Sequence, residues 1–105
     1  MGLIHHLAEP AHWAEAVRTG SYRRSTRGRT LEQEGFIHAS RPEQVAGVWK
    51  AFYADASEAL LLLTIDTDEL TSPWQDAVGD DTFPHVYGPI NASAVVRVEP
   101  LPNER

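Results

Sequence analysis

Histidine occurs in three segments that look like strands: "LIHHLA", "GFIHAS" and "FPHVYGPIN". In an extended segment, residues two apart share a face, so Ser40 joins His38 and Tyr87 joins His85. An imidazole titrates near neutral pH and can act as a general acid or base. Tight Gly and Pro boundaries beside these groups let a backbone approach a ligand closely. The pattern predicts a lined pocket with His6, His38 and His85 on its walls.

Each of these residues also has a structural interpretation. A histidine on a strand is often a partly buried residue that hydrogen-bonds to backbone, which applies to His6. Ser40 has the type and position of a helix N-cap, and Tyr87 is an ordinary strand aromatic. The residues alone leave both interpretations open.

Several other kinds of site find no support in the sequence. Three imidazoles are a known zinc ligand set, but no H-x-H or H-E-x-x-H pair occurs, so we expect no metal. The chain has no cysteine, which excludes disulfides and thiolate chemistry. The glycine motifs of dinucleotide folds, P-loops and hydrolase elbows are also missing.

Charge is divided unevenly between the two halves of this 105-residue chain. The formal net charge is −6, yet residues 1–50 carry +2 and residues 51–105 carry −8. Five of the nine basic residues fall in one short stretch, Arg18, Arg23, Arg24, Arg27 and Arg29. An acidic protein disfavours unspecific binding to nucleic acid, whereas a local arginine loop suits a phosphate or pyrophosphate. A solvated, mobile loop is the alternative.

The segment "PAHWAEAVRTG" predicts the first main helix. Pro10 suits the first turn and Gly20 the C-terminal stop. Trp13, Ala16 and Val17 form its apolar face. A single helical turn follows at "TLEQEG", where a threonine and a glutamine stand at capping-box spacing.

The segment "SRPEQVAGVWKAFYAD" predicts the second main helix. Ser40 suits its N-cap and Glu43 the matching capping-box position. Its apolar residues recur at helical spacing: Val45, Val48, Trp49 and Phe52.

Strands account for most of the remaining chain. The continuous apolar run "ALLLLTID" is typical of a strand buried on both faces at a sheet centre. The predicted strands span 3–8, 35–40, 59–66, 74–78 and 94–99, with "HVYG" between the last two. Strands cluster late and only two helices are full length, so we expect a single α+β domain over residues 1–105.

The motifs "IHHLA", "GSY", "EGFIHAS", "LLLLTIDTDEL" and "FPHVYGPIN" together resemble the bacterial family named domain of unknown function 952. The resemblance covers nearly the whole chain. That family is remotely similar to the ADP-ribosyltransferase superfamily, which includes RNA 2′-phosphotransferases. The resemblance therefore implies two packed, curved small sheets that clamp NAD.

The resemblance also implies roles for particular residues. His6 resembles the first-strand histidine that bonds a ribose hydroxyl, and Ser40 belongs with His38 to the motif beneath the nicotinamide. Tyr22, Arg23 and Arg24 lie where a loop covers the dinucleotide. Catalytic roles fall to His38, His85 and Tyr87. The superfamily usually has a glutamate in this third motif, whereas the chain reads His-Val-Tyr.

Three hypotheses about function follow. The first is a transferase acting on NAD or another phosphorylated nucleotide through ADP-ribosyl- or phospho-transfer. The second is a nucleotide or small-molecule binding module without catalysis, and the third is a protein-interaction domain. The N-terminus has no basic leader and no apolar run is long enough for a membrane span, so we expect a cytoplasmic protein. No pattern demands a partner subunit, and we expect a monomer.

Overall fold

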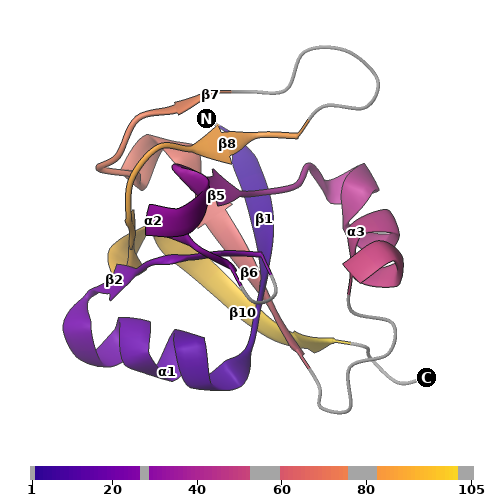
Figure 1. Ribbon diagram of the computed structural model, residues 1–105, viewed down its shortest axis with the longest axis horizontal. Helices are drawn as coiled ribbons and strands as arrows, with labels where there is room; N and C mark the ends of the chain where they lie inside the picture. Colours follow the sequence, from indigo (N-terminus) through magenta and orange to yellow (C-terminus); the bar gives the residue numbers. More distant parts are fainter. Residues whose placement is uncertain (1, 27–28, 53–59, 76–82, 102–105) are drawn as a thin grey trace.

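The larger of two three-stranded sheets runs through the centre of the molecule (Figure 1). The computed structural model describes residues 2–26, 29–52, 60–75 and 83–101. Within these, the sheet is antiparallel and its order is β1-β6-β10. Its strands are β1 (Leu3–Ala8), β6 (Leu60–Asp66) and β10 (Val95–Leu101). The apolar run of β6 therefore occupies the sheet centre, as its sequence predicts.

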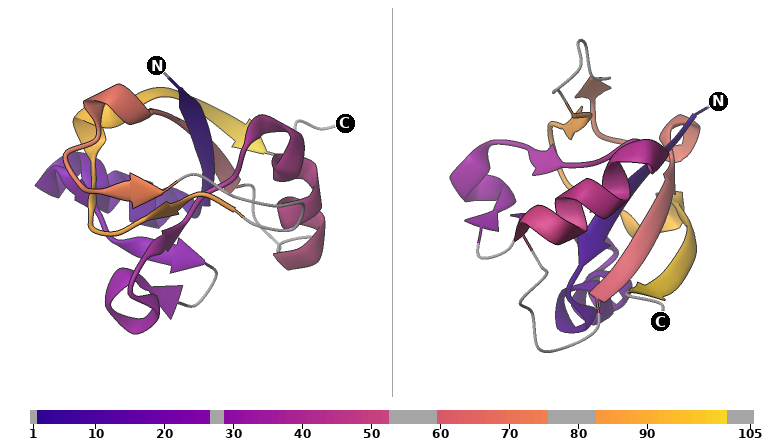
Figure 2. Two further views of the ribbon diagram at one scale, coloured as in Figure 1. Left: turned by 90° about the horizontal axis from the view of Figure 1, so that it is seen from above. Right: turned by 90° about the vertical axis from the view of Figure 1, so that its right-hand side faces the viewer.

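The second three-stranded sheet crosses above the first and has the order β5-β8-β7 (Figures 1 and 2). Its strands are β5 (Ile37–His38), β8 (His85–Val86) and β7 (Trp74–Gln75). His5 of β1 and Ser40 exchange two backbone hydrogen bonds of 2.7 Å each. This bridge ties the end of the β5 segment to the edge of the larger sheet. Part of the strand expected over 74–78 lies outside the described residues.

The arginine-rich stretch forms short strands where the sequence predicts a loop. β2 (Ser21–Tyr22) pairs with β9 (Ile90–Asn91), and β3 (Arg24–Thr26) pairs with β4 (Arg29–Thr30). Strands of two or three residues are too short to show an alternation of apolar and polar residues. β2 is recognisable as a strand only from its pairing with β9, which is distant in the sequence.

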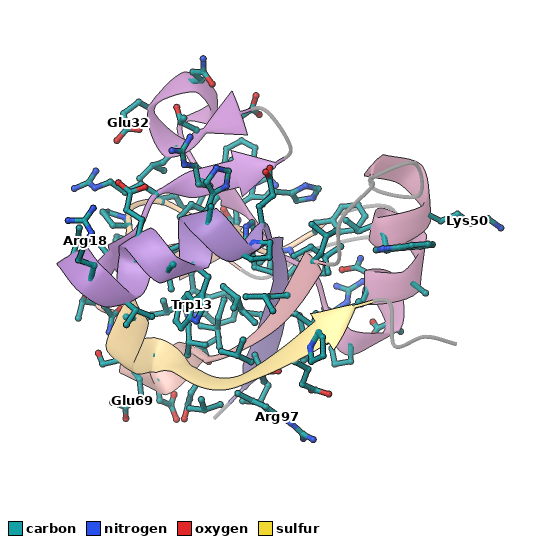
Figure 3. All side chains as sticks on the ribbon, turned by 90° about the horizontal axis from the view of Figure 1, so that it is seen from below. Trp13, Arg18, Glu32, Lys50, Glu69 and Arg97 are labelled. Carbon is teal, nitrogen blue, oxygen red and sulfur yellow. The ribbon has the colours of Figure 1, made fainter. Side chains whose placement is uncertain are left out.

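The first helix, α1 (Pro10–Thr19), begins and ends as predicted. Pro10 occupies its first turn, and Gly20 closes it with a left-handed φ of 90°. Ala16 is buried, and Trp13, labelled in Figure 3, packs against the core. The prediction for Val17 is wrong, because its side chain is 60% exposed. The helix contacts the sheet along a narrower stripe than its apolar residues suggest.

A short helix, α2 (Leu31–Glu34), carries the predicted capping box. The Gln33 backbone N–H donates to Thr30 Oγ1 at 3.2 Å, and the Thr30 N–H donates to Gln33 Oε1 at 2.9 Å. Two of the orphan donors of the first turn are thereby satisfied.

The third helix, α3 (Val45–Phe52), does not begin at Ser40 as predicted. A 3₁₀ turn, η1 (Pro42–Gln44), precedes it. The Arg41 N–H donates to Gln44 Oε1 at 2.8 Å, so Gln44 and not Glu43 returns to the backbone. The backbone N–H and C=O of Ser40 are bonded to His5 of β1, so the chain at Ser40 is extended and the helix begins only after Pro42. Two further 3₁₀ turns are η2 (Thr67–Glu69) and η3 (Ala92–Ala94).

The two faces of the larger sheet bury different cores. On one face, Ile4, Leu63 and Ile65 pack with residues of the second sheet and α1. On the other face, Leu7 and Leu60 pack against Val48 of α3. The fold is thus a small α+β domain with several antiparallel sheets and few helices. None of the helices in the described part of the chain is long and apolar enough to cross a bilayer.

Candidate functional site

Histidine and aromatic side chains share the outer face of the β5-β8-β7 sheet. His38 of β5 stands directly opposite His85 of β8. Their neighbours Ile37 and Val86 are fully buried in the core, so alternation directs the two histidines outward. This outer face, defined by Phe36, His38, His85 and Tyr87, brings together all three residues for which catalysis was predicted. Their roles stay predictions.

His85 is held between two neighbours on the outer face. Its ring stacks on Phe36 with centroids 4.0 Å apart. The Tyr87 hydroxyl donates to Gln75 Oε1 at 3.3 Å and lies 3.4 Å from His85 Nδ1. Because the phenol proton is directed at Gln75, His85 Nδ1 must donate to the phenol oxygen. Nε2 then remains as the basic nitrogen of His85.

His38 is half-buried beside His85, with ring centroids 6.0 Å apart. The Phe83 ring packs edge-on against it at 4.7 Å. Burial lowers the pKa of His38, the charge of His85 lowers it further, and Glu34 opposes them. The His38 imidazole is therefore biased toward its neutral form, which is the form that accepts a proton.

The His6 side chain lies in the interior, 4% exposed, beneath the second sheet. Its Nδ1 is 2.7 Å from the carbonyl oxygen of His38, and its Nε2 is 2.9 Å from the hydroxyl of Tyr22. A carbonyl only accepts, so Nδ1 carries the proton and Tyr22 donates to Nε2. Burial lowers the pKa of His6 to about 4, although the bond to the His38 carbonyl opposes this. His6 is a neutral group at neutral pH.

Tyr22 and Ser40, both predicted to bind a ligand, are buried as well. Tyr22 is 2% exposed and meets the His6 ring edge-on at 5.0 Å. Ser40 is 5% exposed and is bridged through its backbone to His5. The predicted pocket residues are therefore divided between the interior and the outer face.

A cavity of about 440 Å³ opens beside α1. It contains two of the predicted arginines, Arg23 and Arg24. Arg23 Nη1 lies 3.0 Å from Glu32 Oε2, and Arg24 Nη2 lies 3.9 Å from Glu15 Oε1. The lining residues are His12, Glu15, Thr19, Ser21, Arg23, Arg24, Thr30 and Glu32. We call this the α1 cavity.

Sequence reasoning missed most of the lining of the α1 cavity. His12, Glu15 and Thr19 recur at i, i+3 and i+7, so they share the face of α1 that lies away from the core. The helical spacing of these three residues is visible in the sequence. The spacing does not indicate that another element faces this side of α1 and closes a cavity. The turn at β4 and α2 supplies Thr30 and Glu32. Among the described residues, no three side chains of metal-binding type are grouped to hold an ion.

Comparison with known proteins places this geometry in a family. Two crystal structures of protein CC0527 from Caulobacter crescentus, one of them a double mutant, share the fold with a TM-score of 0.76. Each is 27% identical in sequence, and the match covers 94% of this chain and 85% of that one. No curated protein matches. A family model described as a protein of unknown function (DUF952) matches residues 7–98. The chain therefore belongs to the DUF952 family.

Proposed function

We propose that the protein binds a phosphorylated nucleotide of the NAD or ADP-ribose type in the α1 cavity. The observation that carries the proposal is that Arg23 and Arg24 line one cavity of about 440 Å³ together with three hydroxyl side chains. This volume is in the range of small-molecule sites. Two guanidinium forks suit a diphosphate, because each binds phosphate oxygens in a bidentate manner.

Glu32 and Glu15 form ion pairs with Arg23 and Arg24. All four side chains are between 39% and 63% exposed, so these ion pairs are screened by water. Such pairs contribute little stability, and a diphosphate can displace the carboxylates at small cost. The same argument predicts that affinity falls as salt concentration rises.

The transferase form of this proposal assigns acid–base chemistry to the outer face, whose residues do not line the α1 cavity. It therefore requires the bound nucleotide to extend from that cavity to the outer face. His38 and His85 stand opposite each other there, and Tyr87 orients His85. A neutral imidazole is suited to take a proton from an attacking hydroxyl or phosphate. The choice of a nucleotide as substrate rests on the remote resemblance to ADP-ribosyltransferases that the sequence motifs imply. His6, Tyr22 and Ser40 would then act by positioning the strands that carry the site.

A binding module without transfer chemistry is the second candidate. It is favoured by the cross-strand neighbours of His85, which are His38 and Gln75. Neither is a carboxylate, whereas cleavage of a nicotinamide bond builds positive charge on the ribose that a carboxylate stabilises. A histidinium there would oppose that charge.

Calorimetric titration with NAD, ADP-ribose and pyrophosphate tests nucleotide binding. We expect saturable binding that weakens at least about tenfold in Arg24→Gln, since a charge-assisted contact is lost. Arg18→Gln is the matched control, because it removes the same charge from α1 outside the cavity lining. No binding of any of the three compounds at millimolar concentration contradicts the proposal. Specific capture of a protein partner in that case favours the interaction domain.

Release of nicotinamide separates the two candidates. Turnover of NAD that is lost in His85→Ala while ADP-ribose still binds supports the transferase. Binding of ADP-ribose without turnover of NAD supports the binding module.

A further inference from the structure

The free edge of β10 carries a self-complementary sequence. β10 is the outer strand of the β1-β6-β10 sheet, and the right view of Figure 2 shows it on the outside of that sheet. Among the described residues, no strand pairs with its backbone groups on that side, and such unpaired groups are a template for strand addition. Two exposed large apolar residues fall on this strand, Val96 at 56% and Val98 at 40%.

The backbone direction at Val98 follows from Pro100. A proline in an edge strand directs its nitrogen away from the ladder, because it has no N–H to donate. Residues two apart in a strand direct their backbone groups to the same side. The N–H and C=O of Val98 then point away from β6, toward the free edge.

Two residues of opposite charge flank Val98. Arg97 and Glu99 flank it, and Arg97 Nε lies 3.1 Å from Glu99 Oε2 within the chain. Figure 3 shows Arg97 extending from β10 toward solvent. If a second copy of this strand pairs antiparallel with Val98 opposite Val98, each Arg97 stands opposite the Glu99 of the other copy. Opposite charges in that position stabilise a strand pair.

We propose that two copies of the chain associate through β10, in antiparallel register about Val98, to form a two-fold dimer. The contact uses the same surface of both copies. Because the β10 edge of each copy is then occupied by the other, a third copy cannot add through it and association stops at two. The register shift between Val95 and Arg97 at one end and Pro100 at the other confine the pairing to a short segment. No sequence pattern indicated this surface, because only the sheet order makes β10 an edge.

The dimer is weak and depends on concentration. Pairing of one short strand buries much less than the roughly 1,600 Å² of a standard interface. The net charge of −6 on each chain also opposes association. The proposal is independent of the α1 cavity, which β10 does not line.

Charge reversal tests the register by sedimentation velocity over a range of protein concentrations. Arg97→Glu and Glu99→Arg each place like charges opposite one another, and we expect each alone to weaken the dimer by about tenfold or more. An equimolar mixture of the two variants restores opposite pairs and regains the dimer. Arg18→Glu on α1 is the control, because it changes the net charge by the same amount as Arg97→Glu away from β10. We expect it to associate more strongly than Arg97→Glu does in the same buffer.

Three results overturn the proposal. One is an unchanged chain that stays monomeric at millimolar concentration. Another is a pair of single variants that associate as strongly as the unchanged chain. The third is a mixture of the variants that gains no dimer over its components. The Arg97 side chain is 70% exposed and that of Glu99 38% exposed. Thermal melts that match the unchanged chain confirm that the variants fold.

Discussion

His6 and Tyr22 form a buried side-chain pair in which the tyrosine hydroxyl donates to His6 Nε2 across 2.9 Å. The other ring nitrogen donates to the His38 carbonyl, so the imidazole connects β1, β2 and β5. A ring with both nitrogens satisfied and 4% of its surface exposed supports the fold directly. The pair also fixes the backbone of His38 beneath the outer face.

Tyr22→Phe is expected to lower the free energy of unfolding by about 1–3 kcal/mol, because it leaves His6 Nε2 buried without a donor. Urea denaturation followed by circular dichroism measures the loss. Tyr87→Phe is the matched control: its hydroxyl lies on a side chain that is 43% exposed, and we expect a change within about 0.5 kcal/mol. Equal losses in the two variants would show that the His6 contact contributes nothing particular.

Acid is expected to destabilise the protein through His6. Its pKa is about 4 in the folded chain against 6.5 as the reference, so between these values the unfolded chain binds more protons. The free energy of unfolding then falls as pH decreases from about 6.5 to about 4, by about 3 kcal/mol in all. Burial also lowers the pKa values of His5 and His38, which adds to the fall.

Urea denaturation at a series of pH values measures this slope, and His6→Gln is the variant to compare. Its amide keeps a donor and an acceptor but does not titrate in this range. The variant should show a shallower dependence on pH whatever its absolute stability. A slope identical to that of the unchanged chain assigns the acid sensitivity to other groups.

Phe83→Ala is expected to raise the pKa of His38. Burial is the largest cause of the lowered pKa, and the Phe83 ring covers His38 at a centroid distance of 4.7 Å. Removing the ring readmits water, which favours the charged imidazole. Titration of the imidazole resonances by NMR measures the shift. Phe36→Ala serves as control, since Phe36 stacks on His85 instead; an unchanged His38 pKa in Phe83→Ala would contradict the assignment.

Local signals in the sequence determined several elements of this protein. Pro10 and Gly20 bound α1, and the capping box of Thr30 and Gln33 forms α2. Each depends on residues within one or two turns, whose preferences the remaining fold does not override. The run of β6 is long and apolar enough to be buried wherever the sheet forms. Alternation likewise placed His85 and Tyr87 on one face.

The tertiary structure alone decided which of these faces meet. His38 stands opposite His85 because β8 adds beside β5, and a period of two residues specifies a face but not a neighbouring strand. The bridge from Ser40 to His5 overrode a good capping residue. The α1 cavity draws its lining from α1 and from the strands and turn facing it, which no local pattern relates. Burial of His6 and the free edge of β10 follow from the same long-range pairing, because sheet order is set by packing of the whole chain.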